Sequence, residues 1–158
     1  MEKSFLAPAE ILEALLESGD KKARLPVSKL LVLGILAGAF IAFAAEGSNV
    51  AIHTIPSLGL AKALAGTLFA TGLILVVVAG AELFTGNCLI VAPCLAGRTP
   101  WHLMLRNWFY VYIGNLIGSL FIAIFILLSG QLNFSGGMLG GFTIQVAAYK
   151  TGLNFTNA

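Results

Sequence analysis

The chain has 158 residues, of which 58% are hydrophobic and only 10% are charged, and its formal net charge is +2. Soluble domains carry about 25% charged residues, so this composition excludes a soluble enzyme, a disordered region and a nucleic-acid-binding protein. An integral membrane protein remains. At roughly 20 apolar residues per helical span, the length allows about three or four spans.

The first 27 residues predict a short surface helix followed by a basic linker. Residues 8–19 place apolar side chains on one stripe and glutamates on the other side, with Pro8 suited to the first turn and Gly19 to the C-cap. We expect this helix to lie on the membrane surface or beneath the bundle; the alternative is a solvated leader. Four basic residues follow: Lys21, Lys22, Arg24 and Lys29.

Apolar runs then predict the membrane spans. The first run is Leu30–Ala45, and Glu46–Asn49 follow near its outer end. His53, Pro56 and Gly59 mark a connection that ends near Lys62. The third clear span runs from about Trp108 to Leu128, with aromatic residues clustered at its start. Glycines four apart in the first and third runs favour close approach of another helix. These glycines are Gly34, Gly38, Gly114 and Gly118.

The second apolar run, Ala63–Ala81, is the start of a predicted broken helix. Between Lys62 and Arg98 lie 35 residues with a single charge, Glu82. This length is too great for one straight span and too short for two spans with a turn. We therefore predict a break near Glu82–Asn87 and a short second helical piece. Backbone freed inside a membrane must be buried in protein or line a watery cavity, and transporters place their sites at such breaks.

The basic residues predict the orientation. Seven of the nine fall on one side of the predicted spans, which places the N-terminus in the cytoplasm of a multi-pass protein of the cell membrane; Lys62 and Lys150 are the exceptions. The polar stretch 142–158 predicts a loop leading into a further span. The resulting organisation is a cytoplasmic N-terminal helix with a basic linker over 1–27, a first three-helix transmembrane repeat over 28–136, and an outer loop leading into a truncated fourth helix over 137–158.

Two acids within the apolar stretches are candidates for function, because charges inside a membrane are costly. Glu82 either binds a cation, relays a proton or caps the amides freed by the break. Glu46 is expected to pair with a neighbouring helix or subunit. Thr85 and Asn87 either cap the chain or coordinate a small solute.

Other polar and apolar candidates also have two interpretations. Phe69 and Leu73, four apart on one helix face, either pack in the core or constrict a pore. Lys150 is either an ordinary solvated residue or a cation that concentrates anions at a pore mouth. We expect His53 and His102 to lie in loops without a metal-like partner. Two cysteines, Cys88 and Cys94, suit small packing positions better than a disulfide or a metal pair.

No nucleophile–base pair, phosphate loop or metal cluster is evident in the sequence. We therefore predict no catalytic residue, no metal and no cofactor, and the chain is not expected to be an enzyme.

The stretch GLILVVVAGAELFTGNCLIV resembles the second helix of the formate/nitrite transporter family, and RTPWHLMLRNWFYVYIGNLIGS resembles its third helix. AGAFIAF and AAYKTGLNF fit the family as well, so the resemblance covers essentially the whole chain. It implies an all-α, aquaporin-like helical bundle of two inverted three-helix repeats, assembled in the lipid bilayer as a homopentamer with one pore per subunit. The implied solutes are small monovalent anions, formate first, with nitrite or hydrosulfide as the alternatives.

The resemblance also implies site roles. The N-terminal helix corresponds to a segment that gates the inner mouth. Glu82 occupies a position that the family often fills with an acid. Lys150 corresponds to a basic residue at the outer vestibule. Phe69 and Leu73 correspond to the cytoplasmic-side constriction. Leu83, Phe84 and Thr85 correspond to the family's loop at the break of the second helix. In that loop, Thr85 is the polar residue that faces the pore centre.

The family pattern continues beyond the matched residues with a fourth helix, a second broken helix carrying a central histidine, and a sixth. Neither His53 nor His102 matches that histidine. We therefore expect the chain to be the first half of such a channel, ending as the fourth span begins. A non-transporting fragment is the alternative. A water or glycerol channel ranks low, because the Asn-Pro-Ala boxes are absent.

Overall fold

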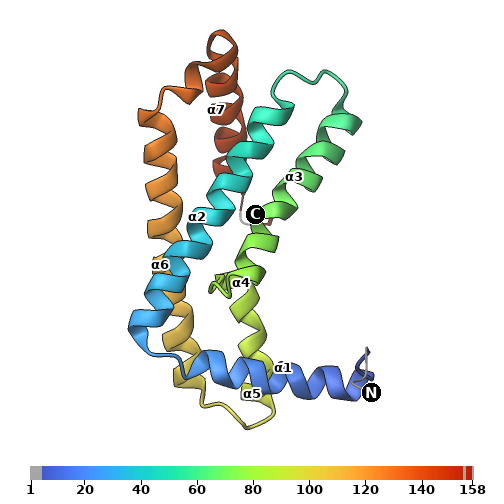
Figure 1. Cartoon of the computed structure of the whole chain (residues 1–158), viewed down its shortest axis with the longest axis vertical. Helices are drawn as coiled ribbons and strands as arrows, with labels where there is room; N and C mark the ends of the chain where they lie inside the picture. Colours follow the sequence, from blue (N-terminus) through green and yellow to red (C-terminus); the bar gives the residue numbers. More distant parts are fainter. Residues whose placement is uncertain (1–4, 155, 158) are drawn as a thin grey trace. The chain divides into compact units, whose positions relative to one another are not determined.

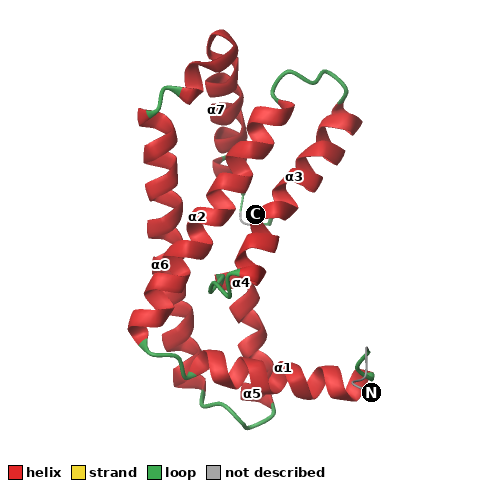
Figure 2. Cartoon of the chain, in the orientation of Figure 1, coloured by secondary structure: helices red, strands yellow, loops and turns green. Residues whose placement is uncertain are grey.

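A computed structural model describes residues 5–154, 156 and 157, and within these residues every regular element is helical (Figures 1 and 2). The elements in chain order are α1 (Pro8–Ala23), α2 (Val27–Ile52), α3 (Leu58–Val78), α4 (Phe84–Asn87), η1 (Cys88–Ile90), α5 (Val91–Leu95), α6 (Trp101–Leu128), η2 (Gln131–Gly137) and α7 (Met138–Thr151).

Three of these helices are long and apolar enough to cross a membrane. They are α2, α3 and α6, with 26, 21 and 28 residues. At about 1.5 Å per residue, each covers the roughly 30 Å of bilayer hydrocarbon. This confirms the predicted fold class, an all-α membrane protein with three spanning helices.

The chain forms two compact units. Unit 1 comprises the chain up to Gly38 together with Val76–Gly118, and unit 2 comprises Ala39–Leu75 together with the chain from Ser119 onward. Each unit therefore contains a part of α2, α3 and α6. The short elements α1, α4, η1 and α5 belong to unit 1, and η2 and α7 belong to unit 2.

The break in the second span is confirmed, and the backbone shows how it is made. Gly80 takes a left-handed conformation with φ of +61°. The N–H of Ala81 donates to the carbonyl of Val76, and that of Gly80 donates to the carbonyl of Val77. This glycine-centred pattern ends α3 at Val78, because a left-handed residue cannot continue the helix. The short pieces α4, η1 and α5 follow.

Several predicted boundaries were wrong. α2 extends beyond the apolar run that ended at Ala45, through Glu46–Asn49 to Ile52, and ends just before His53, where the predicted connection begins. α6 begins at Trp101, directly after Pro100, so His102 lies on a helix and not in a loop. A proline suits this position, since its fixed φ and missing N–H fit a helix start.

α1 is also longer than predicted, because Gly19 lies inside it and does not cap it. A Cβ atom on Gly19 would lie 2.8 Å from Cγ of Pro93 in α5. The missing side chain therefore lets α1 pack directly on η1 and α5, with Leu16 and Ala23 also buried.

The stretch 142–158, predicted as a loop leading into a fourth helix, is helical over most of its described length. α7 begins at Met138, after Gly136 and Gly137 have reversed the chain with positive φ angles. The polar residues Gln145 and Lys150 lowered the hydropathy of this stretch, but a 14-residue helix tolerates exposed polar side chains.

Candidate functional site at the helix break

A buried polar network surrounds the break in unit 1. The side chain of Glu82 accepts two hydrogen bonds, at Oε1 from Nζ of Lys22 (2.8 Å) and at Oε2 from Nδ2 of Asn87 (2.7 Å). Nδ2 of Asn87 also donates to Oδ1 of Asn107 (2.9 Å). Glu82 is 3% exposed, and Asn87 and Asn107 are completely buried. Because Lys22 supplies a positive charge, the buried carboxylate is paired as well as hydrogen-bonded.

This network joins α1 to α6. Nδ2 of Asn107 donates to the carbonyl of Lys22 (2.9 Å), and Nε1 of Trp108 donates to the carbonyl of Asn87 (2.9 Å). Nη2 of Arg106 donates to the carbonyls of Ala23 and Leu25. These carbonyls lie at the end of α1, where a cation is favourable.

Asn115 of α6 satisfies the backbone that the break exposes. Its Oδ1 accepts a hydrogen bond from the N–H of Phe84 (2.9 Å), and its Nδ2 donates to the carbonyls of Glu82 (2.9 Å) and Gly34 (2.8 Å). The N–H of Glu82 donates to the carbonyl of Leu33 in α2 (3.2 Å). Backbone freed at membrane depth is thus bonded to two spans, as burial in an apolar environment requires.

The glycines predicted to allow close approach do so between α2 and α6. The Cα atoms of Gly34 and Gly114 face each other, since a Cβ on either would lie about 3 Å from the other's Cα. A Cβ on Gly38 would overlap the main-chain oxygen of Asn115. The two helices therefore touch through their backbones, which is what brings Asn115 within reach of α2.

The three predicted loop residues lie beside this network. Leu83 and Phe84 are half-buried, and Thr85 is exposed. The ring of Phe84 makes edge contacts with Trp108 and Tyr112 of α6, with ring centroids 5.9 and 5.5 Å apart. The loop is thus anchored by its phenylalanine and presents its threonine at the surface.

The remaining predicted site residues belong to unit 2. Phe69 and Leu73 lie on α3 and are 45% and 52% exposed, and Lys150 is exposed in the last turn of α7. The structure brings Glu82 and Asn87 together through a hydrogen bond, and their role in supporting the break stays a prediction.

Sequence reasoning missed most members of the network: Lys22, Asn107, Trp108 and Asn115. The available signal was the presence of two asparagines within the apolar helix α6. A polar side chain in a span is costly unless it has a partner.

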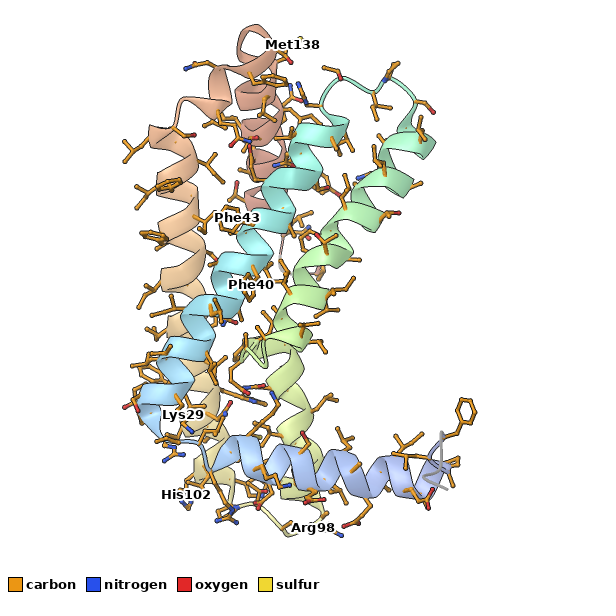
Figure 3. The ribbon with its side chains drawn as sticks, in the orientation of Figure 1. Lys29, Phe40, Phe43, Arg98, His102 and Met138 are labelled. Atoms are coloured by element: carbon orange, nitrogen blue, oxygen red, sulfur yellow. The ribbon has the colours of Figure 1, made fainter. Side chains whose placement is uncertain are left out.

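An ion pair and a hydrogen bond hold α1 to the connection before α6. Glu13 accepts from both Nη1 and Nη2 of Arg98 (2.6 and 2.8 Å), and these hydrogen bonds lower the pKa of the Glu13 carboxyl. Asp20 accepts from Arg24 and from the hydroxyl of Thr99 (2.7 Å), which lowers its pKa in the same way. In Figure 3, Lys29, Arg98 and His102 are labelled at this end of unit 1.

Three apolar spanning helices, one followed by a break whose backbone is bonded to its neighbours, define an all-α membrane protein with a discontinuous span. The chain belongs to the formate/nitrite transporter family, whose sequence profile matches residues 9–158.

The curated proteins that this chain is similar to are named as channels or transporters. The formate channel FocA of Escherichia coli K12 is 37% identical over 157 residues, which cover 98% of this chain and 55% of the relative. The uncharacterized transporter YrhG of Bacillus subtilis is 44% identical (96% and 58% covered), and the probable formate transporter of Methanothermobacter thermautotrophicus is 34% identical (100% and 60% covered). The chain thus spans a little over half the length of these relatives.

Proposed function

We propose that this chain supplies half of a membrane channel for small monovalent anions, with formate as the first-choice solute. The observation that carries the proposal is the buried network around Glu82, Asn87 and Asn115. This network stabilises the break in a membrane span. The named relatives of the chain include formate channels. Discontinuous helices of this kind are where membrane transporters bind their solutes.

The proposed path combines an apolar constriction with a hydrogen-bond donor. Phe69 and Leu73 exclude larger ions and remove water from the anion. The hydroxyl of Thr85 then donates a hydrogen bond that offsets part of the lost hydration. Lys150 raises the local anion concentration at the mouth. Glu82 supports the loop and does not touch the anion, because both carboxylate oxygens already accept hydrogen bonds.

The proposed assembly is a homopentamer in the cell membrane with the N-terminus in the cytoplasm, and residues 28–136 form the first repeat. Support for the orientation comes from the described basic residues and the positive-inside rule. Unit 2 contains Lys62 and Lys150. Unit 1 contains Lys21, Lys22, Arg24, Lys29, Arg98 and Arg106.

The test is anion flux into proteoliposomes that contain the chain, measured with formate, nitrite, hydrosulfide and a larger carboxylate. Leu73→Ala is expected to admit the larger carboxylate. The matched control is Leu75→Ala, since Leu75 is 45% exposed on the opposite side of the same helix. Equal selectivity in the two variants would remove Leu73 from the constriction.

A second arm addresses the alternative of a non-transporting fragment. Here the chain replaces the matching 157 residues of the Escherichia coli formate channel. Flux from this chimera but not from the chain alone would show that the chain serves as one half of a pore. Preference for nitrite or hydrosulfide over formate in competition would reassign the solute, and no flux in either arm would refute the proposal.

A further inference from the structure

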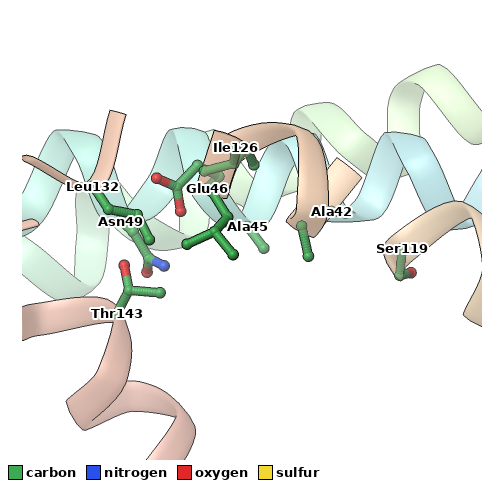
Figure 4. A pocket seen from close by; sticks show the side chains of 10 residues that line it. Ala42, Ala45, Glu46, Asn49, Ser119, Ile126, Leu132 and Thr143 are labelled. Carbon is green, nitrogen blue, oxygen red and sulfur yellow. The ribbon is translucent and has the colours of Figure 1, made fainter. Parts of the chain in front are cut away.

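Unit 2 contains a pocket of about 490 Å³ that none of the proposed transport roles uses. It lies between α2, α6, η2 and α7, and its walls are mainly alanine, isoleucine and leucine side chains. Of its four polar side chains, Glu46, Asn49 and Thr143 lie toward one end, and Ser119 lies apart from them (Figure 4). The pocket is thus apolar over most of its wall and polar at one end.

Two of these side chains have unsatisfied polar atoms. Glu46 is 8% exposed, and its Oε1 has no hydrogen-bond partner among the described residues. The hydroxyl oxygen of Thr143 is buried with no partner in the same part of the chain. A buried carboxylate without a counter-charge is strongly destabilising. By contrast, the other buried acid, Glu82, has both oxygens bonded.

We propose that this pocket binds one monovalent cation, with Glu46 as its counter-ion and the side-chain oxygens of Asn49 and Thr143 as neutral ligands. The site offers a single negative charge, which one monovalent cation neutralises. Divalent ions in proteins require more oxygen ligands and usually more than one carboxylate. No group of three or more histidine, cysteine or acidic residues occurs in the described part of the chain.

The same charge argues against an anion in this pocket, so the site is separate from the proposed path of the solute. A volume of about 490 Å³ holds more than a bare ion, since one water occupies about 30 Å³. The occupant is therefore an inorganic ion with some of its water, or a small organic ammonium whose apolar part lies against the alanine and leucine walls. Both carry the one positive charge that the site requires.

The test is thermal unfolding of the purified chain in detergent, with Na⁺, K⁺ or ethylammonium chloride titrated at constant ionic strength against the bulky cation N-methyl-D-glucamine. We expect a saturable rise in Tm of about 5 °C with at least one of the three. Saturation by Na⁺ or K⁺ identifies an inorganic ion, and saturation by ethylammonium alone identifies an organic ammonium.

Variants assign the effect to the pocket. Glu46→Gln is expected to abolish the cation-dependent rise, and Thr143→Val to raise the half-saturating concentration about tenfold, which corresponds to about 1.4 kcal/mol. If Glu46→Gln does not fold, Thr143→Val still tests the site. The control is Glu17→Gln, which removes an exposed acid of α1 and should leave the rise unchanged. Equal Tm in all four salts, or an undiminished rise in Glu46→Gln and Thr143→Val, would overturn the proposal.

Discussion

The substitution Asn115→Leu tests whether the polar network holds the break. Leucine fills a similar volume but removes three hydrogen bonds, those to the N–H of Phe84 and to the carbonyls of Glu82 and Gly34. Each such bond contributes about 0.5–1.5 kcal/mol, and a buried backbone group left without a partner costs at the upper end of this range or more.

The three bonds together give an expected destabilisation of about 3 kcal/mol. For a chain of this size, 1 kcal/mol shifts Tm by about 2–4 °C, so the expected drop is roughly 6–12 °C. The assay is thermal unfolding in detergent followed by circular dichroism. The matched control is Asn133→Leu, because Asn133 is exposed in unit 2, and a surface change of this kind is expected to shift stability by less than about 0.5 kcal/mol.

An Asn115→Leu variant that melts within about 2 °C of the parent chain would contradict this role of Asn115. In that case the carbonyls and N–H at the break would not depend on α6 for their hydrogen bonds. A drop in both the Asn115→Leu and Asn133→Leu variants would point to a general effect of added leucine instead.

Three further predictions follow from the same contacts. Gly38→Ala should destabilise the folded chain by about 1–3 kcal/mol, because its Cβ would overlap the α6 main chain. Gly47→Ala is the control and should leave Tm unchanged, because the space around Gly47 is open. Lys22→Met should lower the free energy of unfolding by on the order of 2 kcal/mol, because it leaves the buried Glu82 carboxylate without its partner. The double variant with Glu82→Gln should recover part of this loss, because the Gln side chain is neutral. A double variant whose drop in Tm equals the sum of the two single drops would contradict the pairing. Because the pKa of Glu13 is lowered by its arginine partner, protection of α1 from proteolysis should be complete above about pH 4.3 and decline as pH falls through the depressed pKa. In the Glu13→Gln variant the part of this pH dependence that comes from Glu13 should disappear, and the part that comes from Asp20, whose pKa is also lowered, should remain.

The sequence alone was sufficient for the spans and the break. Apolar runs and the position of a single charge are local properties, and they located three membrane helices and a discontinuity within a few residues of Gly80. Helix ends were less accurate. α1 passes through Gly19, because packing against η1 and α5 outweighs the local preference of one glycine.

Only the tertiary structure identified what holds the break and where an acid lacks a partner. Lys22 reaches Glu82 across 60 positions of the chain, and Nδ2 of Asn107 reaches the carbonyl of Lys22 across 85. A sequence pattern reports what each residue tolerates, such as an asparagine in an apolar run, but a hydrogen bond depends on which distant group the fold brings within about 3 Å. Glu82 and Glu46 are both lone acids within apolar stretches of the sequence. The fold places Lys22 beside Glu82 and leaves Oε1 of Glu46 without a partner among the described residues.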